Sequence, residues 1–248
     1  MRARLDQILV ERGLCESREK AKRAVMAGQV RVNGQVATKP SDNIKPGDEV
    51  ELTAAEKFVS RGGHKLEHAL ETFRLDVRGL IAVDLGASTG GFTDCLLQRG
   101  AARVYAVDVG QGQLAWKLRQ DARVAVMEKT NARTLTADQF PPGFAPADIA
   151  VIDCSFISLR KILPAAIALI RDNGKIVALI KPQFEAGRAE ADRGEGVISD
   201  PAVHARVLRE LESFVLTLPG VVWRTVTESP LRGPAGNKEF LVLIEKRG

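Results

Sequence analysis

The sequence predicts an α/β protein whose larger domain is built on a doubly wound, mostly parallel sheet with an antiparallel edge strand, preceded by a smaller α+β domain. From residue 64 onward, short apolar runs alternate with amphipathic stretches, which is typical of parallel strands connected by helices. The last two apolar runs have no helix between them, which favours a hairpin at the sheet edge. The formal net charge of +5 lies within the first 39 residues, which sets the N-terminal part of the chain apart.

The smaller domain begins with two short helices. Apolar residues within 5–10 predict the first helix. The second helix begins after Ser17, a residue type that caps helices, and ends at a glycine. An Asn-Gly pair at 33–34 lies between valines and predicts a hairpin, and Val50–Leu52 supplies a further short strand. We place the end of this domain at residue 60.

Positive charge gathers on the smaller domain. Residues 1–39 hold nine Lys/Arg and four Asp/Glu, whereas the remainder holds 27 of each. This asymmetry indicates a polyanionic partner, and the alternative is a solvated basic face without one. The two helices and the hairpin, in the segments 4–13 and 30–34, resemble the S4 RNA-binding domain. The resemblance implies RNA as the partner, with the following RNA-binding residues: Arg4, Arg18, Lys20, Lys22, Arg23 and Arg61.

The composition argues against several classes of protein. The longest apolar runs, 163–170 and 176–180, are shorter than the roughly 20 residues that span a membrane. The first residues lack the apolar core of a secretory signal, so we expect a cytoplasmic protein. Three dispersed cysteines and only three histidines support neither a disulfide framework nor a metal site.

The two domains are joined by a linker that we expect at about residues 53–63, because this stretch lacks a hydrophobic period and ends in Gly62-Gly63. We place the second domain at residues 61–248. We expect Trp116 and Trp223 to pack in its core. Its loop 185–198 is suited to an RNA-contacting lid. The expected helices are 64–73, 92–98, 159–170 and 201–218, and the expected strands are 80–83, 103–107, 124–127, 149–152, 175–180, 221–226 and 240–244.

A glycine-rich loop follows the first strand of the second domain. Gly86, Gly90 and Gly91 come after Asp84 and before a helix, where the backbone must turn tightly and admit a ligand. The glycine spacing fits neither the dinucleotide-binding fingerprint nor a P-loop. It resembles motif I of S-adenosylmethionine-dependent methyltransferases, and the resemblance implies that cofactor.

The next strand end carries a second element of a nucleoside site. Asp108 lies where a carboxylate can accept hydrogen bonds from both ribose hydroxyls. By the same resemblance, Asn131 hydrogen-bonds the adenine edge. The expected cofactor-binding residues are Asp84, Gly86, Ser88, Thr89, Gly90, Gly91, Phe92, Asp108 and Asn131.

Four charged residues stand at predicted helix or strand ends of the second domain: Lys65, Asp153, Lys181 and Glu239. A ribose 2′-hydroxyl is a weak acid, so its proton must be removed by a strong base. A lysine whose pKa is lowered by a second ammonium group can serve as that base. In chain order and placement the four resemble the Lys-Asp-Lys-Glu tetrad of FtsJ-type ribose 2′-O-methyltransferases. The resemblance implies that Lys181 is the general base and Lys65 the cation that tunes it, while the two carboxylates orient the ammonium groups.

Taken together, the S4-like domain, the glycine-rich loop and the segments 60–66, 153–156 and 181–185 resemble the TlyA family over nearly the whole chain. The resemblance implies a ribosomal RNA 2′-O-methyltransferase acting on a cytidine, in the large subunit and in some members also in the small subunit. Among oligomeric states we favour the monomer.

Four alternatives stand beside this function. Residues 153–156 stand where amino-methyltransferases carry an Asp/Asn-Pro-Pro-aromatic motif, but both prolines are absent, which disfavours methylation of a base amine. Cys154 could attack a cytosine ring as a thiolate, although a small buried residue is the simpler interpretation. A haemolysin-like membrane activity would need an amphipathic or inserting segment, and a binding factor without catalysis would not need the tetrad.

Overall fold

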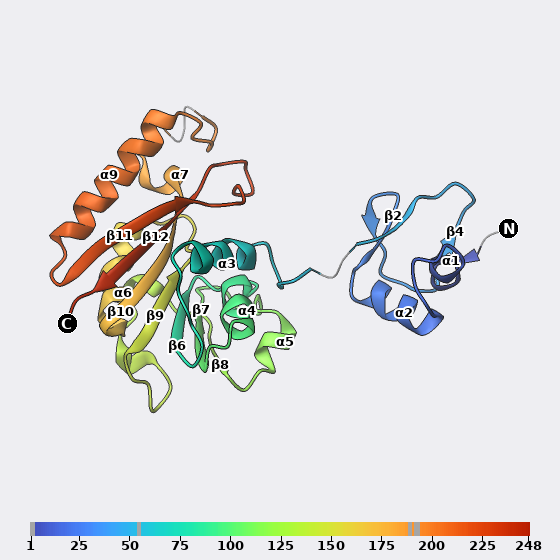
Figure 1. Ribbon diagram of the computed structural model, residues 1–248, viewed down its shortest axis with the longest axis horizontal. Coiled ribbons are helices and arrows are strands. Elements are labelled where there is room, and N and C mark those ends of the chain that lie inside the picture. Colours follow the sequence, from blue (N-terminus) through green and yellow to red (C-terminus); the bar gives the residue numbers. More distant parts are fainter. Residues whose placement is uncertain (1–2, 54–55, 188–189, 191–193) are drawn as a thin grey trace. The chain divides into compact units, whose positions relative to one another are not determined.

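The computed structural model describes residues 3–53, 56–187, 190 and 194–248. The chain forms two compact units, residues 1–57 and 58–248 (Figure 1). Residues 54 and 55 of the expected linker, and residues 188, 189 and 191–193 of the expected lid, lie outside the described part.

In its described residues the N-terminal unit has two helices and five short strands. Its core contains Leu5 and Leu9 of the first helix and Val25 of the second, packed against Val30. The Ser17 side chain accepts a hydrogen bond from the Lys20 amide, which caps the second helix as expected. Its elements are β1 (Ala3–Arg4), α1 (Leu5–Glu11), α2 (Arg18–Met26), β2 (Val30–Val32), β3 (Gln35–Val36), β4 (Asn43–Ile44) and β5 (Val50–Leu52), with sheet orders β3-β2-β5 and β1-β4.

The second unit is built on a seven-stranded sheet of order β11-β12-β10-β9-β6-β7-β8. Strand β12 runs antiparallel to both of its neighbours, β10 and β11, so the expected edge hairpin of β11 and β12 is confirmed. The strands are β6 (Ile81–Leu85), β7 (Arg103–Val107), β8 (Val124–Met127), β9 (Ala147–Ile152), β10 (Ile170–Ile180), β11 (Val221–Glu228) and β12 (Phe240–Lys246). The helices are α3 (Gly62–Thr72), α4 (Gly91–Gln98), α5 (Trp116–Arg119), α6 (Leu159–Leu169), α7 (Pro182–Glu185) and α9 (Pro201–Thr217), with 3₁₀ turns η1 (Ala132–Thr134) and η2 (Ala137–Gln139).

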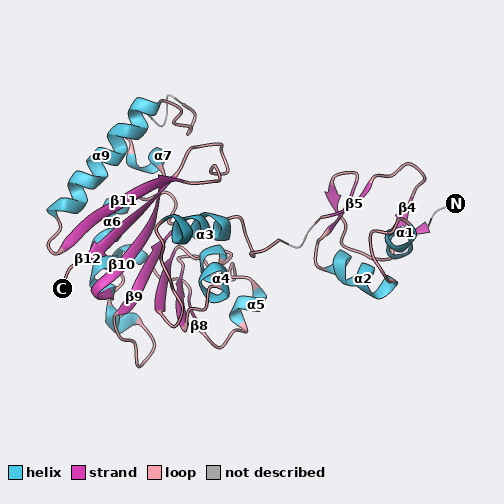
Figure 2. Ribbon diagram, in the orientation of Figure 1, coloured by secondary structure: helices cyan, strands magenta, loops and turns pink. Residues whose placement is uncertain are grey.

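Helices cover both faces of this sheet (Figure 2). Because side chains alternate along a strand, Val83 and Leu85 of β6 belong to the core on the α6 and α9 side. Ala82 belongs to the core on the α3 and α4 side. This three-layer arrangement is the doubly wound fold that the alternating pattern predicted.

The strand ends bring distant residues together at one edge of the sheet. Strands β6, β7, β9 and β10 are parallel, so the residues that follow them emerge at the same edge. Strand β12 is antiparallel to β10, with Ile180 opposite Phe240, so its first residue lies at that edge too. The chain order reverses around β6, which has β9 on one side and β7 on the other, and such switch points are where ligands bind in open α/β sheets.

Two expectations about local structure are wrong. Gly62 and Gly63, placed in the linker, are the first residues of α3. A Cβ on Gly63 would lie 2.2 Å from the ring of buried Phe58, so only glycine fits there. The glycine pair allows close packing there and does not provide flexibility. Trp116 is 73% exposed at the start of α5, whereas Trp223 packs on the core as expected. Within the described residues no helix is long and apolar enough to cross a membrane.

Candidate active site

The glycine-rich loop between β6 and α4 has a backbone that requires glycine at two positions. Gly86 and Gly90 have φ values of +88° and +96°, a region in which side chains are strained. A Cβ on Gly86 would also lie 2.8 Å from the backbone oxygen of Asp153. The loop therefore packs directly on the segment that follows β9, and each fixes the position of the other.

Asp108 holds the same loop from the side. Its carboxylate oxygens accept hydrogen bonds from the amides of Ser88 at 2.8 Å and Gly110 at 2.7 Å. A carboxylate oxygen has more than one acceptor site, so both oxygens remain able to accept a hydroxyl. Asp108 therefore orders the loop and also presents a carboxylate to the adjoining cavity.

That cavity, which we call the nucleoside cavity, has a volume of about 450 Å³. Asn131 lies on its wall; its side-chain oxygen accepts from the Arg133 amide at 3.0 Å, which leaves the NH₂ group available. The donors and acceptors fit a nucleoside, with a carboxylate for hydroxyls and an amide for a base edge. It is lined by Gly86, Ser88, Asp108, Val109, Gln113, Thr130, Asn131, Ala132, Asp153, Cys154, Ser155, Phe156, Ile157 and Ile162.

Asp84 has a different place from the one its motif suggested. It is fully buried beneath the loop and lines neither this cavity nor the one beside it. Thr93 donates a hydrogen bond of 2.7 Å to its Oδ2, and Oδ1 has no hydrogen-bond partner among the described residues. Burial is the largest influence and raises the pKa of Asp84 to about 7. The structure gives Asp84 a supporting position below the loop, and the expectation of direct cofactor contact is corrected accordingly.

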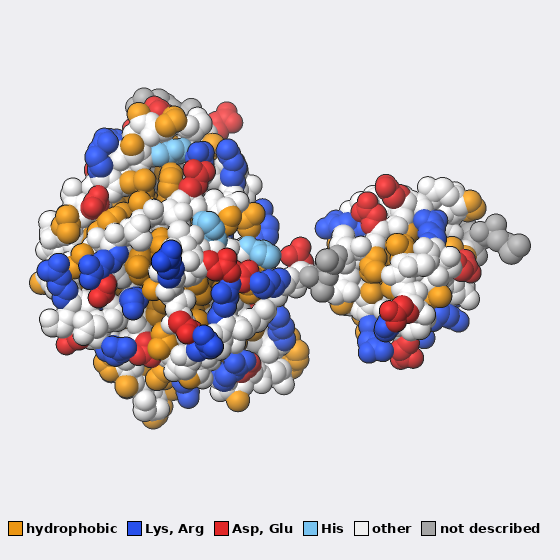
Figure 3. Space-filling view, in the orientation of Figure 1, with side chains coloured by type: hydrophobic (Ala, Val, Ile, Leu, Met, Phe, Trp, Pro, Cys, Tyr) orange, Lys and Arg blue, Asp and Glu red, His pale blue; other side chains and the backbone are white. Residues whose placement is uncertain are grey.

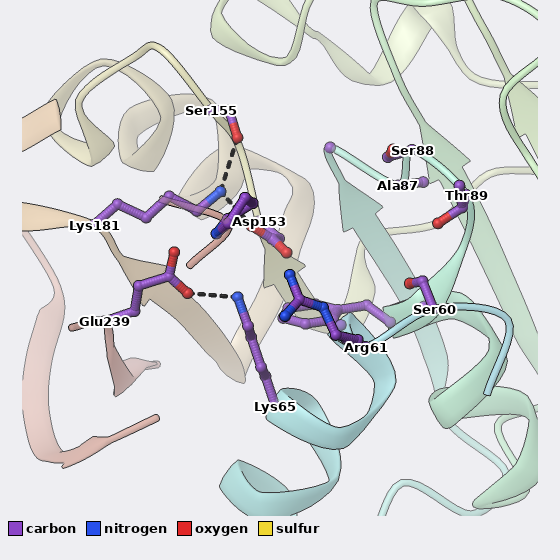
Figure 4. A pocket seen from close by; sticks show the side chains of 15 residues that line it. Ser60, Arg61, Lys65, Ala87, Ser88, Thr89, Asp153, Ser155, Lys181 and Glu239 are labelled. Carbon is purple, nitrogen blue, oxygen red and sulfur yellow. Dashed lines mark hydrogen bonds and ion pairs between the residues drawn. The ribbon is translucent and has the colours of Figure 1, made fainter. Parts of the chain in front are cut away.

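The four charged residues singled out in the sequence lie around a second cavity of about 270 Å³, which we call the tetrad cavity (Figure 4). Lys65 pairs with Glu239 at 2.5 Å, and Lys181 pairs with Asp153 at 2.5 Å. Lys65, Lys181 and Glu239 are 7%, 8% and 1% exposed. Two ammonium groups and two carboxylates therefore face one small space, each charge matched by an opposite one.

The fold explains how residues so far apart in sequence meet. Lys65 lies in the first turn of α3, and Glu239 comes directly before β12. Asp153 and Lys181 follow the neighbouring parallel strands β9 and β10. Pro182 begins the short helix α7, so the chain turns away from the sheet at Lys181.

The tetrad cavity and the nucleoside cavity share part of their walls, namely Gly86, Ser88, Asp153 and Ser155. Thr89, Gly91 and Phe92 of the glycine-rich loop line the tetrad cavity, whereas Gly90 lines neither and packs against Leu114 and Leu118. A ligand in the nucleoside cavity thus lies beside the four charged residues.

A third space, the aromatic cavity, opens on the other side of Lys181 and has a volume of about 440 Å³. Phe156 and Phe184 line it with ring centroids 5.1 Å apart. Phe156 is 90% exposed and has a φ of +62°, unusual for a residue with a side chain. Both phenylalanines lie within the motifs 153–156 and 181–185, but only the fold brings them together.

Ser60 and Ser155 also belong to the tetrad cavity and were not among the expected site residues. The Ser155 hydroxyl accepts a hydrogen bond of 2.9 Å from Lys181 Nζ. Ser60 carried no chemical signal in the sequence. Ser155 could have been noted from its position two residues after Asp153.

Cys154 does not have the environment of a nucleophile. Burial is the main reason that its pKa is raised to about 12, with the nearby Asp153 charge adding to the effect. Its Sγ lies 3.4 Å from the Leu85 carbonyl oxygen. A thiolate is therefore strongly disfavoured at neutral pH, which argues against attack on a cytosine ring.

Five of the six expected RNA-binding residues are exposed on the N-terminal unit. Arg4 and Arg18 contact the buried carboxylate of Asp6 at 3.0 and 3.1 Å, and Lys20 pairs with Glu16. In the face seen in Figure 3, basic side chains of this unit are interspersed with acidic ones. The sixth residue, Arg61, lines the tetrad cavity of the second unit.

The doubly wound sheet and the paired cavities at its switch point define a Rossmann-like methyltransferase of the S-adenosylmethionine-dependent class. The same fold occurs in the O-methyltransferase TomG from Streptomyces achromogenes, solved with S-adenosylmethionine, at a TM-score of 0.51 and 19% identity, covering 77% of this chain and 82% of TomG. Residues 58–246 match the model of the FtsJ-like methyltransferase family, and residues 3–50 match the S4 domain. The chain belongs to the FtsJ-like methyltransferase family and, within it, to the S4-containing TlyA proteins, as its motifs predicted.

Relatives support the assignment over the full length. The Mycobacterium tuberculosis (strain ATCC 25618 / H37Rv) protein named 16S/23S rRNA (cytidine-2′-O)-methyltransferase TlyA is 45% identical over 98% of this chain and 90% of its own length. A solved structure from Streptococcus thermophilus, named as a hemolysin, is 47% identical with a TM-score of 0.74, covering 99% of this chain and 89% of that one.

Proposed function

We propose that this protein transfers a methyl group from S-adenosylmethionine to the ribose 2′-hydroxyl of a cytidine in ribosomal RNA. The observation that carries the proposal is the set of four buried or half-buried charges around the tetrad cavity, with Lys181 lining both that cavity and the aromatic cavity. The name of the mycobacterial relative supports cytidine as the nucleotide and ribosomal RNA as the substrate class.

In this proposal the cofactor occupies the nucleoside cavity. Asp108 accepts its ribose hydroxyls, Asn131 meets its adenine, and the glycine-rich loop encloses its methionine portion. When bound, the cofactor supplies an electrophilic methyl group. The wall shared by the two cavities allows that group to face the tetrad.

Lys181, as the neutral amine, would take the proton of the 2′-hydroxyl as the oxygen gains the methyl group, while the methyl–sulfur bond of the cofactor would break and release S-adenosylhomocysteine. Asp153 orients the Lys181 side chain through their contact of 2.5 Å. Lys65 stabilises the negative charge that develops on the 2′-oxygen, and Glu239 holds Lys65 at 2.5 Å. Because the reacting groups are preorganised and half excluded from water, most of the rate enhancement comes from alignment and electrostatics.

The aromatic cavity suits the base of the target nucleotide. A base stacked in a helix cannot reach an enclosed site, so it is turned out of the stack, and aromatic rings recover part of the lost stacking. Phe156 and Phe184 provide such rings next to Lys181. In the proposal, the S4 unit supplies RNA affinity through its exposed basic residues, and the large subunit is the preferred substrate.

The proposal is tested with purified ribosomal subunits and labelled S-adenosylmethionine. Lys181→Ala should abolish methyl transfer while cofactor binding, measured by calorimetry, stays within about twofold of wild type. Lys161→Ala, an exposed lysine on α6, serves as the matched control and should remain fully active. Mass spectrometry of the product nucleoside should give 2′-O-methylcytidine. A methylated base, or turnover by Lys181→Ala, would refute the proposal.

A further inference from the structure

Ser155 occupies a position that no other described residue shares, because it lines the tetrad, nucleoside and aromatic cavities. Its side chain is exposed to these spaces. Its hydroxyl oxygen accepts a hydrogen bond of 2.9 Å from Lys181 Nζ, as the dashed line in Figure 4 marks.

The contacts of Lys181 restrict where its nitrogen can react. A tetrahedral amine nitrogen has one bond to Cε and three further directions. Two protein oxygens lie close to it: Ser155 Oγ accepts a hydrogen bond at 2.9 Å, and Asp153 Oδ1 forms an ion pair at 2.5 Å. In the neutral amine one N–H donates to Ser155, the Asp153 carboxylate attracts the second N–H to its side, and the lone pair takes the remaining direction.

We propose that Ser155 is a positioning residue for Lys181 in the methyl transfer proposed above. It accepts one N–H of the neutral amine, and together with Asp153 it leaves the lone pair directed into the tetrad cavity, toward the 2′-hydroxyl of the acceptor. With Asp153 alone, the amine can rotate about its Cε–Nζ bond, and the lone pair is no longer fixed.

The backbone around Ser155 is held firmly enough to perform this role. The Asp153 amide donates to the Leu85 carbonyl at 3.0 Å, and Gly86 packs against the Asp153 oxygen. On the other side, Glu185 of α7 accepts from the Ser158 hydroxyl at 2.6 Å and from the Leu159 amide at 2.7 Å. The segment 153–158 is thus tied both to the glycine-rich loop and to the helix that follows Lys181.

The experiment compares Ser155→Ala, Ser155→Thr and Lys181→Ala by steady-state kinetics on purified ribosomal subunits, with cofactor affinity measured by calorimetry. Ser155→Ala should lower kcat about 10- to 100-fold, the range expected when a reacting group loses its alignment. KM for the subunit and the cofactor Kd should change less than about twofold. Ser155→Thr keeps the hydroxyl at an exposed position, so it should recover most of kcat.

The outcomes separate this inference from the proposed function. Unchanged kcat in Ser155→Ala, a loss confined to KM or cofactor Kd, or no recovery in Ser155→Thr despite an unaltered melting temperature, would each overturn the role of Ser155. If Lys181→Ala is inactive, the proposed function with Lys181 as the base still stands whichever of these results is obtained. Full turnover by Lys181→Ala would instead overturn the proposed function, and with it the inference.

Discussion

The buried carboxyl group of Asp84 makes the stability of the second unit depend on pH. Its side chain is fully buried, and its pKa rises from 3.8 to about 7, mainly through burial. Because the folded pKa lies above the unfolded one, the folded protein holds more protons between these values. The contribution of Asp84 to the free energy of unfolding is therefore fully present below pH 4 and is lost as the pH rises toward 7.

The magnitude follows from the two pKa values. Between pH 4.5 and pH 8, an acid whose pKa rises from 3.8 to about 7 on folding loses about 3 kcal/mol of stability. Asp84→Asn removes the titration and keeps an oxygen that can accept from Thr93. The free energy of unfolding of the variant minus that of wild type should therefore be about 3 kcal/mol higher at pH 8 than at pH 4.5, which means that the variant is relatively more stable at pH 8.

Urea unfolding followed by tryptophan fluorescence measures this difference. Both tryptophans of the chain, Trp116 and Trp223, belong to the second unit, so the signal reports on that unit alone. Comparing one variant at two pH values cancels any pH-independent effect of the amide. Asp138→Asn, at an exposed carboxylate, is the control and should give the same difference at both pH values. An Asp84→Asn difference that is equal at pH 4.5 and pH 8 would refute the reasoning.

Two further predictions concern ligand binding. Gly86→Ala should weaken S-adenosylmethionine binding at least tenfold in calorimetry, because the φ of +88° is strained for alanine and the new Cβ would lie 2.8 Å from the Asp153 oxygen. The control is Gly112→Ala, which is also at positive φ but has open space around it, and this variant should bind the cofactor normally. Replacing the exposed Lys22 and Arg23 by alanine should weaken RNA binding and lower the slope of log K against log salt by roughly two. An unchanged slope would show that these side chains make no phosphate contacts.

The sequence alone determined the architecture of the second unit. Strands and helices alternate with a clear period, and this local signal survives into the fold because the central strands are buried between helices. The charge asymmetry and the spacing of Gly86, Gly90 and Gly91 were likewise visible without a structure. These features are local or compositional, so a linear reading captures them.

The tertiary structure decided how those residues are used. It paired Lys65 with Glu239 and Lys181 with Asp153, buried Asp84 beneath the loop, and made Gly63 a packing contact for Phe58. Each of these results depends on distances between segments far apart in the chain, which no local pattern encodes. Asp84 becomes buried, and its pKa is raised, only when the chain folds. The three cavities likewise meet at Ser155 only after the sheet has brought its strand ends to one edge.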